Sequence, residues 1–175
     1  MRKWLALILA VILFAAVHEG THALLAAAYG EYETFHVRPY GLEVTYRTPV
    51  EERQGVKWGL IAGASNLVTL LLGYLLLPFK SRFAQHPRAF VRQLAFYSTA
   101  FFLLLDPLNL SIIPFFFGGD TGGIVVGFGV PRFAVQAVSL VVFLLNRELL
   151  VHKVFPAYSV KSSHPLFRPW ILGRP

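Results

Sequence analysis

Residues 4–29 read WLALILAVILFAAVHEGTHALLAAAY, an apolar run that is interrupted by one polar cluster. At about 1.5 Å per residue, a run of about 20 such residues crosses the hydrocarbon core of a bilayer as one α-helix. The cluster, His18-Glu19-Gly20-Thr21-His22, has the pattern His-Glu-x-x-His. Because residues i and i+4 share a helix face, His18 and His22 can reach one zinc ion, with Glu19 beside it. Ionisable groups at membrane depth are costly and usually functional, so the pattern predicts hydrolysis within a membrane.

The composition is typical of a multi-pass membrane protein. The 175-residue chain is 55% hydrophobic and 15% aromatic, and its length leaves room for about four spans. It contains no cysteine, which excludes disulfides and thiolate metal sites. The net charge is +7, but the sequence has no basic run that would form an element for binding a nucleic-acid groove. We therefore expect contact with the lipid bilayer and none with nucleic acid.

Apolar runs and helix breakers place the other spans, which we expect at residues 58–77, 89–105 and 133–150. The first run also resembles a signal peptide, but its apolar core is longer than such peptides need, and we expect it to be retained as a span. The sequence thus predicts an all-α, polytopic, integral membrane protein. Its core covers residues 1–155, and residues 156–175 form a basic tail rich in proline and aromatic residues, lying on the membrane surface or disordered.

Two segments between the spans are predicted to have other structures. Glu31–Arg53 is too polar to cross, and apolar and polar residues alternate from Phe35 to Tyr46 around Pro39-Tyr40-Gly41. This alternation predicts a membrane-associated β-hairpin after the first span. Gly118–Gly123 precedes the last span, and its glycines allow the backbone to bend back into the membrane. We expect a glycine-rich re-entrant loop there, covered by protein or lining a cavity.

Polar residues from three spans are predicted to meet at one depth. At about 1.5 Å per residue, His18 and His22 lie roughly 10–16 Å inside the membrane, counted back from the C-terminal end of the first span. Asn66 of the second span lies roughly 14 Å deep on the same scale. The third span returns to this side of the membrane, so the segment from Asp106 to Asp120 also ends nearby.

A zinc site on such a helix needs a third protein ligand and an open position. The chain has only two aspartates, Asp106 and Asp120. Asp106 precedes Pro107, where a capping or turn role is the simpler interpretation. Asp120 lies among glycines that allow the backbone to approach a metal closely, so we favour Asp120 as the third ligand.

These residues resemble the site-2 protease family of intramembrane zinc metalloproteases. His18-Glu19-Gly20-Thr21-His22 lies on a first core span and is followed by a hairpin, as in the family. Gly63-Ala64-Ser65-Asn66 is similar to the family's Gly-Pro-x-x-Asn element, and Asn109–Pro114 leading to Gly119-Asp120 is similar to its Asn-x-x-Pro…Asp-Gly element. The resemblance covers about residues 5–150.

The chain departs from the family pattern in its third element. The spacings from Asn109 to Pro114 and from Pro114 to Asp120 are longer than usual, and Thr121 follows Asp120 where the family has glycine. The family's larger members carry an extramembrane domain that filters substrates. This chain shows no such domain, so the resemblance implies a minimal member.

The resemblance implies one Zn²⁺ per chain, held by His18, His22 and Asp120, with Glu19 activating a water molecule. The substrate would be a single-span membrane protein, cleaved within or near its transmembrane segment. Asn66 and Asn109 are expected to donate hydrogen bonds to the oxyanion or the substrate backbone, or alternatively to form interhelical hydrogen bonds. The hairpin is expected to pair with an extended substrate strand or to shield the site.

Two other classes of function stay open at this stage. One is a catalytically inert relative that binds or regulates a membrane client, and the other is a metal-handling protein that uses His18, His22 and Asp120 as a transit site. The orientation also stays open. The basic loop Lys80–Arg92 places both termini in the cytoplasm and the metal nearer the outer face, whereas the resemblance implies a metal nearer the cytoplasm.

Overall fold

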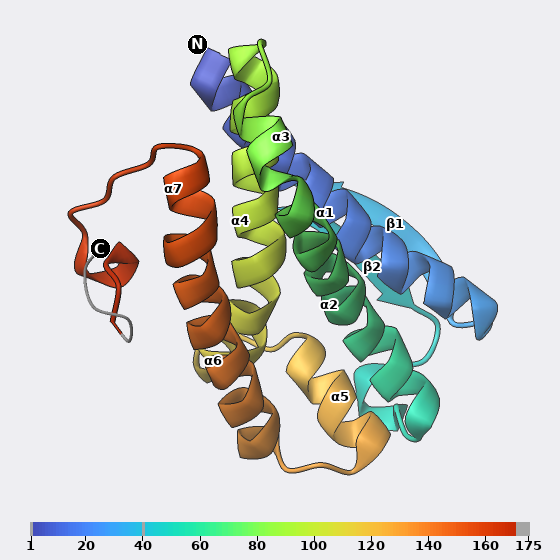
Figure 1. Ribbon diagram of the computed structural model, residues 1–175. Helices are drawn as coiled ribbons and strands as arrows, with labels where there is room; N and C mark the ends of the chain where they lie inside the picture. The colour runs from blue at the N-terminus through green and yellow to red at the C-terminus, as the bar shows by residue number, and fades with distance from the viewer. Residues whose placement is uncertain (1, 40, 171–175) are drawn as a thin grey trace.

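The structure is a computed structural model that describes residues 2–39 and 41–170 (Figure 1). The chain forms a bundle of helices with a two-stranded hairpin lying beside α1. The helices are α1 (Arg2–Ala28), α2 (Val56–Leu76), α3 (Lys80–Ala84), α4 (Ala89–Ser111), α5 (Asp120–Phe128), α6 (Arg132–Leu149) and α7 (Phe155–Ala157), and the strands are β1 (Tyr32–Arg38) and β2 (Gly41–Tyr46).

Four helical segments are long and apolar enough to cross a membrane, which confirms the predicted number and order of such helices. They run through Lys3–Ala28, Val56–Ala84, Ala89–Phe115 and Arg132–Ala157. Large apolar side chains on their outer faces, among them Ile8, Leu71 and Val138, are more than half exposed. An apolar outer surface of this kind fits helices that face lipid, because burying apolar groups in hydrocarbon is favourable.

Helix α4 does not end at Asp106-Pro107, as the sequence analysis expected, but continues to Ser111. Pro107 has no N–H to donate to the carbonyl oxygen of Leu103, one helical turn earlier. Asn146 of α6 donates to that oxygen instead, at 2.8 Å, and its own side-chain oxygen accepts from Tyr74 of α2 at 2.7 Å. The helix break was wrongly predicted because a neighbouring helix supplies the missing donor, as is common in membrane bundles.

The last span also exceeds its predicted end at residue 150. Helix α6 passes through a π-helical turn, Leu150–Val154, into α7. Residues 158–170 then turn back and pack along α6 (Figure 1). The remaining tail residues, 171–175, lie outside the described residues.

The predicted β-hairpin is confirmed. β1 and β2 pair antiparallel, with Phe35 opposite Val44 and His36 opposite Glu43. At its base, Glu31 accepts hydrogen bonds from Lys57 Nζ at 2.5 Å and from Thr48 at 2.7 Å. The hydrogen bond from Lys57 is the main reason why the pKa of Glu31 lies below its usual value. These contacts tie the hairpin to the start of α2.

The glycine-rich segment is only partly a loop, because helix α5 begins at Asp120. Gly119 has a φ of +132°, which favours glycine, and turns the chain into this helix. Helix α5 then packs tightly on α2: a Cβ atom on Gly127 would lie 2.0 Å from the backbone nitrogen of Gly59, and one on Gly123 would lie 2.5 Å from Cβ of Ala62. This close approach fixes the first turn of α5 against α2.

Candidate metal site

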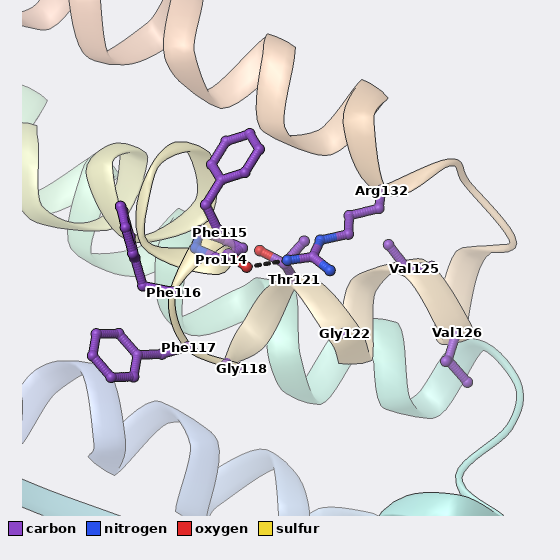
Figure 2. A pocket seen from close by; sticks show the side chains of 11 residues that line it. Pro114, Phe115, Phe116, Phe117, Gly118, Thr121, Gly122, Val125, Val126 and Arg132 are labelled. Atoms are coloured by element: carbon purple, nitrogen blue, oxygen red, sulfur yellow. Dashed lines mark hydrogen bonds between the residues drawn. The ribbon is translucent and has the colours of Figure 1, made fainter.

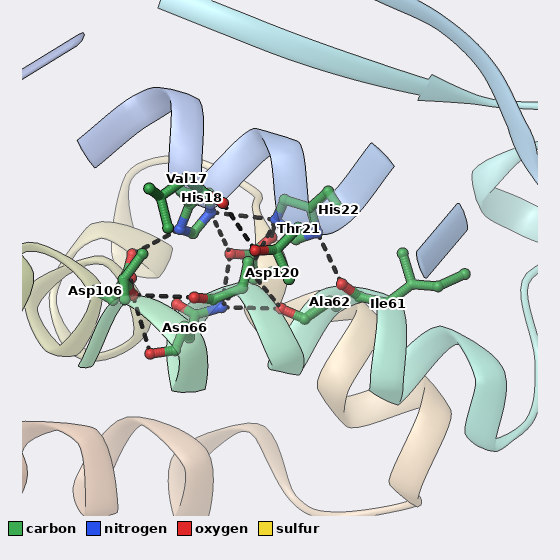
Figure 3. Close-up of polar contacts among 11 residues, drawn as sticks. Val17, His18, Thr21, His22, Ile61, Ala62, Asn66, Asp106 and Asp120 are labelled. Atoms are coloured by element: carbon green, nitrogen blue, oxygen red, sulfur yellow. Dashed lines mark hydrogen bonds and ion pairs between the residues drawn. The ribbon is translucent and has the colours of Figure 1, made fainter. Parts of the chain in front are cut away.

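Three side chains from two distant parts of the chain converge between α1, α2 and α5 (Figure 3). Nε2 of His18 lies 3.2 Å from Oδ2 of Asp120, and Nε2 of His22 lies 3.2 Å from Oδ1 of the same carboxylate. The two Nε2 atoms are themselves 3.2 Å apart. One ligand atom from each residue lies within 4.8 Å of the others, so this cluster could hold a metal ion. Of the two aspartates considered above, it is Asp120 that joins the histidines.

The far nitrogen of each imidazole faces an acceptor. Nδ1 of His22 lies 2.7 Å from the carbonyl oxygen of Ile61. A carbonyl can only accept, so Nδ1 carries a hydrogen, and Nε2, which lies beside Asp120, is the nitrogen that could bind a metal. Nδ1 of His18 lies 3.0 Å from Oδ1 of Asp106, which is ion-pair distance without the geometry of a hydrogen bond. An acceptor behind each histidine is the usual second layer of a metal site, because it fixes the tautomer and the ring orientation.

Asp106 therefore does not have the capping or turn role that we expected. It lies inside α4 and is only 2% exposed. Its second carboxylate oxygen accepts a hydrogen bond from the Thr69 hydroxyl of α2. Asp106 thus connects His18 to two further helices, and the helix does not turn at this point because α4 continues through Pro107.

Asn66 makes an interhelical hydrogen bond to the candidate ligand itself. Its Nδ2 group donates to Oδ2 of Asp120 at 2.9 Å and to the carbonyl oxygen of Ala62 at 2.9 Å. Ser65, its neighbour on α2, places Oγ 3.0 Å from Nε2 of His22. In this arrangement one amide hydrogen of Asn66 goes to Asp120 and the other to its own helix, which is the interhelical alternative given above.

Two cavities meet the cluster, and Glu19 lines both. The larger, of about 550 Å³, runs between α1, β2, α2 and α5 and also reaches His22 and Asp120. The smaller, of about 270 Å³, lies between α1, β2 and α4 and also reaches His18 and Asn109. The structure thus brings His18, His22, Asp120 and Glu19 to one place. It brings Asn109 to the smaller cavity.

The loop before Asp120 is fixed from its other side (Figure 2). Arg132 of α6 donates a hydrogen bond to the carbonyl oxygen of Pro114. A cavity of about 450 Å³ adjoins this contact and shares the wall Gly118-Gly119 with the larger cavity. The side chains of Phe115–Phe117 point away from the loop and are strongly exposed. Asp120 therefore contacts α2 through Asn66, and the loop that precedes it is anchored to α6 through Arg132.

The sequence analysis missed the second layer around the histidines: the carbonyl of Ile61 and the side chains of Ser65, Thr69 and Asp106. For the carbonyl there was no signal, because every residue has one. For Asp106 there was a signal, since a carboxylate inside an apolar run is costly unless it has a partner.

Comparisons of the chain with protein-family models, with curated proteins and with solved structures find no match. The function has to be inferred from the residues of the site and from their geometry.

Proposed function

We propose that the chain is an intramembrane zinc metalloprotease, which hydrolyses a peptide bond within or near the transmembrane segment of a substrate. One observation carries this proposal. The ligand atoms of His18, His22 and Asp120 converge at the wall of a cavity that Glu19 also lines. The resemblance of the motifs to the site-2 protease family supports the same activity, with the chain as a multi-pass member.

The residues fit Zn²⁺. Two imidazole nitrogens and one carboxylate are a common set of three protein ligands in catalytic zinc sites, which keep a further position open. Nδ1 of His22 already has an acceptor, as zinc-binding histidines almost always do, and Nδ1 of His18 lies 3.0 Å from the carboxylate of Asp106. Zn²⁺ held there would act as a Lewis acid that makes water a better nucleophile and polarises the scissile carbonyl. We expect one ion per chain.

Glu19 is assigned the proton transfer. Its carboxylate would accept a proton from the attacking water and deliver it to the leaving amine. Glu19 lines the same cavity as the candidate ligands His22 and Asp120, which supports this assignment. Since the side-chain amide of Asn66 donates to Asp120, we assign Asn66 to orienting that ligand. Asn109, on the wall of the smaller cavity, stays the candidate donor to the oxyanion or to the substrate backbone.

The hairpin is assigned to substrate binding. Strand β2 is paired on one edge with β1, and its residues Val44 and Tyr46 line the larger cavity. An unpaired strand edge offers backbone donors and acceptors to an extended segment, and a helical substrate must unwind locally before its peptide bonds can react. We further propose that residues 112–131, with α5, re-enter the membrane and close the cavity opposite the hairpin.

The test compares purified parent protein with Glu19→Gln in detergent, with single-span membrane proteins as substrates and with zinc content measured. Glu43→Gln is the matched control, because Glu43 lines the same cavity but its carboxylate pairs with Arg38 at 3.0 Å. We expect cleavage by the parent and by the control, at least a hundredfold loss in Glu19→Gln, and about one zinc per chain in all three.

Other outcomes separate the remaining classes. Zinc near one per chain without cleavage by the parent would favour the inert or regulatory relative. Zinc transport into vesicles without cleavage would favour the metal-handling class. Absence of zinc from the parent would overturn the site itself.

A further inference from the structure

A polar cavity of about 480 Å³ lies at the end of the bundle that is remote from the metal site. Its wall contains Lys3, where the first candidate span begins, and Ala84, where the second ends. It also contains Arg92, in the first turn of the third, and Ala157, where the fourth ends. The cavity therefore lies where all four apolar segments stop, which is the depth of lipid headgroups in a bilayer.

The charge of this region has one sign. The segments that build it are residues 2–18, 77–105 and 152–170, and none of them contains Asp or Glu. The wall contains two residues with cationic side chains, Lys3 and Arg92. Arg92 Nη1 donates to the carbonyl oxygens of His86 and Pro87 at 2.7 and 3.1 Å, which orients its side chain. The cavity is thus complementary to an anion.

Ser159 gives a second, independent observation. It is the only non-glycine residue with positive φ, +55°, among residues 2–39 and 41–170, and it lines the cavity. It ends the last helix: the N–H of Val160 donates to the carbonyl of Phe155 at 2.9 Å. Glycine is preferred at this helix-end position because a Cβ atom is strained there. The strained residue is an exposed serine in the lining of the cavity, and its hydroxyl makes no hydrogen bond within residues 2–39 and 41–170.

The inner wall is polar as well. Oε1 of Gln93 and the hydroxyl oxygen of Tyr158 are buried and have no hydrogen-bond partner among the described residues. Unpaired polar atoms are rare in protein interiors, and they often mark the place of a bound water or ligand. Aromatic rings of Phe96 and Tyr97 complete the wall on the side of the apolar bundle.

We propose that this cavity binds the phosphate headgroup of one anionic phospholipid, held by Lys3, Arg92 and Ser159. The guanidinium and ammonium groups provide charge-assisted hydrogen bonds to the phosphate. The position at the ends of all four apolar segments favours a lipid over a soluble anion, since the acyl chains can lie along the exposed apolar faces below. This site is separate from the metal site and does not depend on proteolysis.

Native mass spectrometry of the purified full chain tests the proposal, with dioctanoyl phosphatidylglycerol, dioctanoyl phosphatidylcholine and inorganic phosphate as probes. We expect one phosphatidylglycerol per chain, bound at least about tenfold more tightly than phosphatidylcholine, and no competition by phosphate at equal concentration. Arg92→Gln should weaken phosphatidylglycerol about tenfold or more, and Ser159→Gly should weaken it severalfold. Arg82→Gln is the matched control, since Arg82 is exposed on α3 and does not line the cavity.

Ser159→Gly keeps the test valid if Arg92→Gln folds poorly. Glycine relieves the backbone strain at this position, so any loss of lipid affinity in this variant is not a loss of folding. Equal losses in Arg82→Gln and Arg92→Gln would show diffuse charge attraction and would overturn the site. Equal binding of both lipids, or full competition by phosphate, would overturn the lipid headgroup as its ligand.

Discussion

Two clusters that contain buried charged groups, both among the described residues, are built differently. At the metal site, the side chains of His18, His22, Asp106 and Asp120 contact one another across helices. At the other cluster, Arg147 of α6 is completely buried and donates to the backbone carbonyl oxygens of Leu166 and Arg168, which belong to the returning tail. Its guanidinium also pairs with Glu148 and stacks on Trp170 at 3.9 Å.

The difference is in what the charged groups leave free. Arg147 donates to carbonyl oxygens of the tail and to the carboxylate of Glu148. That carboxylate also pairs with His152 and accepts from the backbone N–H of Trp170. This cluster is saturated, and it fastens the tail to α6. In the metal site, by contrast, two imidazole nitrogens and a carboxylate point at one another beside a cavity. Burial of charge alone therefore does not distinguish the two clusters, whereas convergence of ligand atoms beside open space makes one of them a candidate metal site.

The largest expected effect is a loss of zinc affinity when the candidate metal site is changed, with little change in stability. His22→Ala removes one of three proposed ligands, and we expect zinc affinity to fall by on the order of a thousandfold or more. The loss of the hydrogen bond to Ile61 should lower the free energy of unfolding by only about 1 kcal/mol. Zinc competition against a chelator and thermal unfolding in detergent measure the two quantities. His36→Ala, in the hairpin, is the control and should change neither. Zinc retained at one per chain in His22→Ala would contradict the assignment.

The second prediction reverses the pattern. Arg147→Leu leaves Glu148 and several tail carbonyls without their donor, and we expect the free energy of unfolding to fall by about 3 kcal/mol. Zinc affinity should equal that of the parent, because no residue of the metal site contacts Arg147. Lys153→Met, which removes an exposed charge from the same end of the helix, should be close to neutral. A loss of zinc in Arg147→Leu comparable to that in His22→Ala would show that the clusters are coupled.

The contrast also explains what the sequence could predict. The four long apolar helices and the hairpin are local patterns, periodic or continuous along the chain, and both are found in the structure. The grouping of His18 and His22 is likewise local, since a helix alone places them on one face. Asp120 could be chosen because the chain has only two aspartates and a depth count brought one segment to the histidines.

The remaining features depend on long-range contacts that no local pattern contains. Helix α4 continues through Pro107 because Asn146, about forty residues later, satisfies the carbonyl of Leu103. The tail packs along α6 because its carbonyl oxygens accept hydrogen bonds from the buried Arg147. Helix α5 begins at Asp120, where glycines allow it to contact α2 closely. In each case a partner distant in sequence decides the local structure. Propensity and spacing alone therefore predicted a helix break, a tail that lies on the membrane surface or is disordered, and a loop.

The smallest expected effect concerns Asp106, which belongs to the metal site but lies one layer behind the ligands. Asp106→Asn keeps an acceptor oxygen for Nδ1 of His18. The Thr69 hydroxyl can turn to donate to the carbonyl oxygens of Ser65 or Asn66, at 3.0 and 3.1 Å, and accept from the new amide. The fold should therefore keep its stability within about 1 kcal/mol.

What Asp106→Asn removes is the negative charge that makes the His18 imidazole a stronger ligand, so zinc affinity should fall by about 10- to 100-fold. Chelator competition measures this, and it lies between the parent and His22→Ala. Ser98→Ala is the matched control in the same helix, because the Ser98 hydroxyl is buried and has no partner among the described residues. Unchanged zinc affinity in Asp106→Asn would return Asp106 to a purely structural role. The metal site would then resemble the Arg147 cluster in this one respect, with a buried charge that serves packing alone.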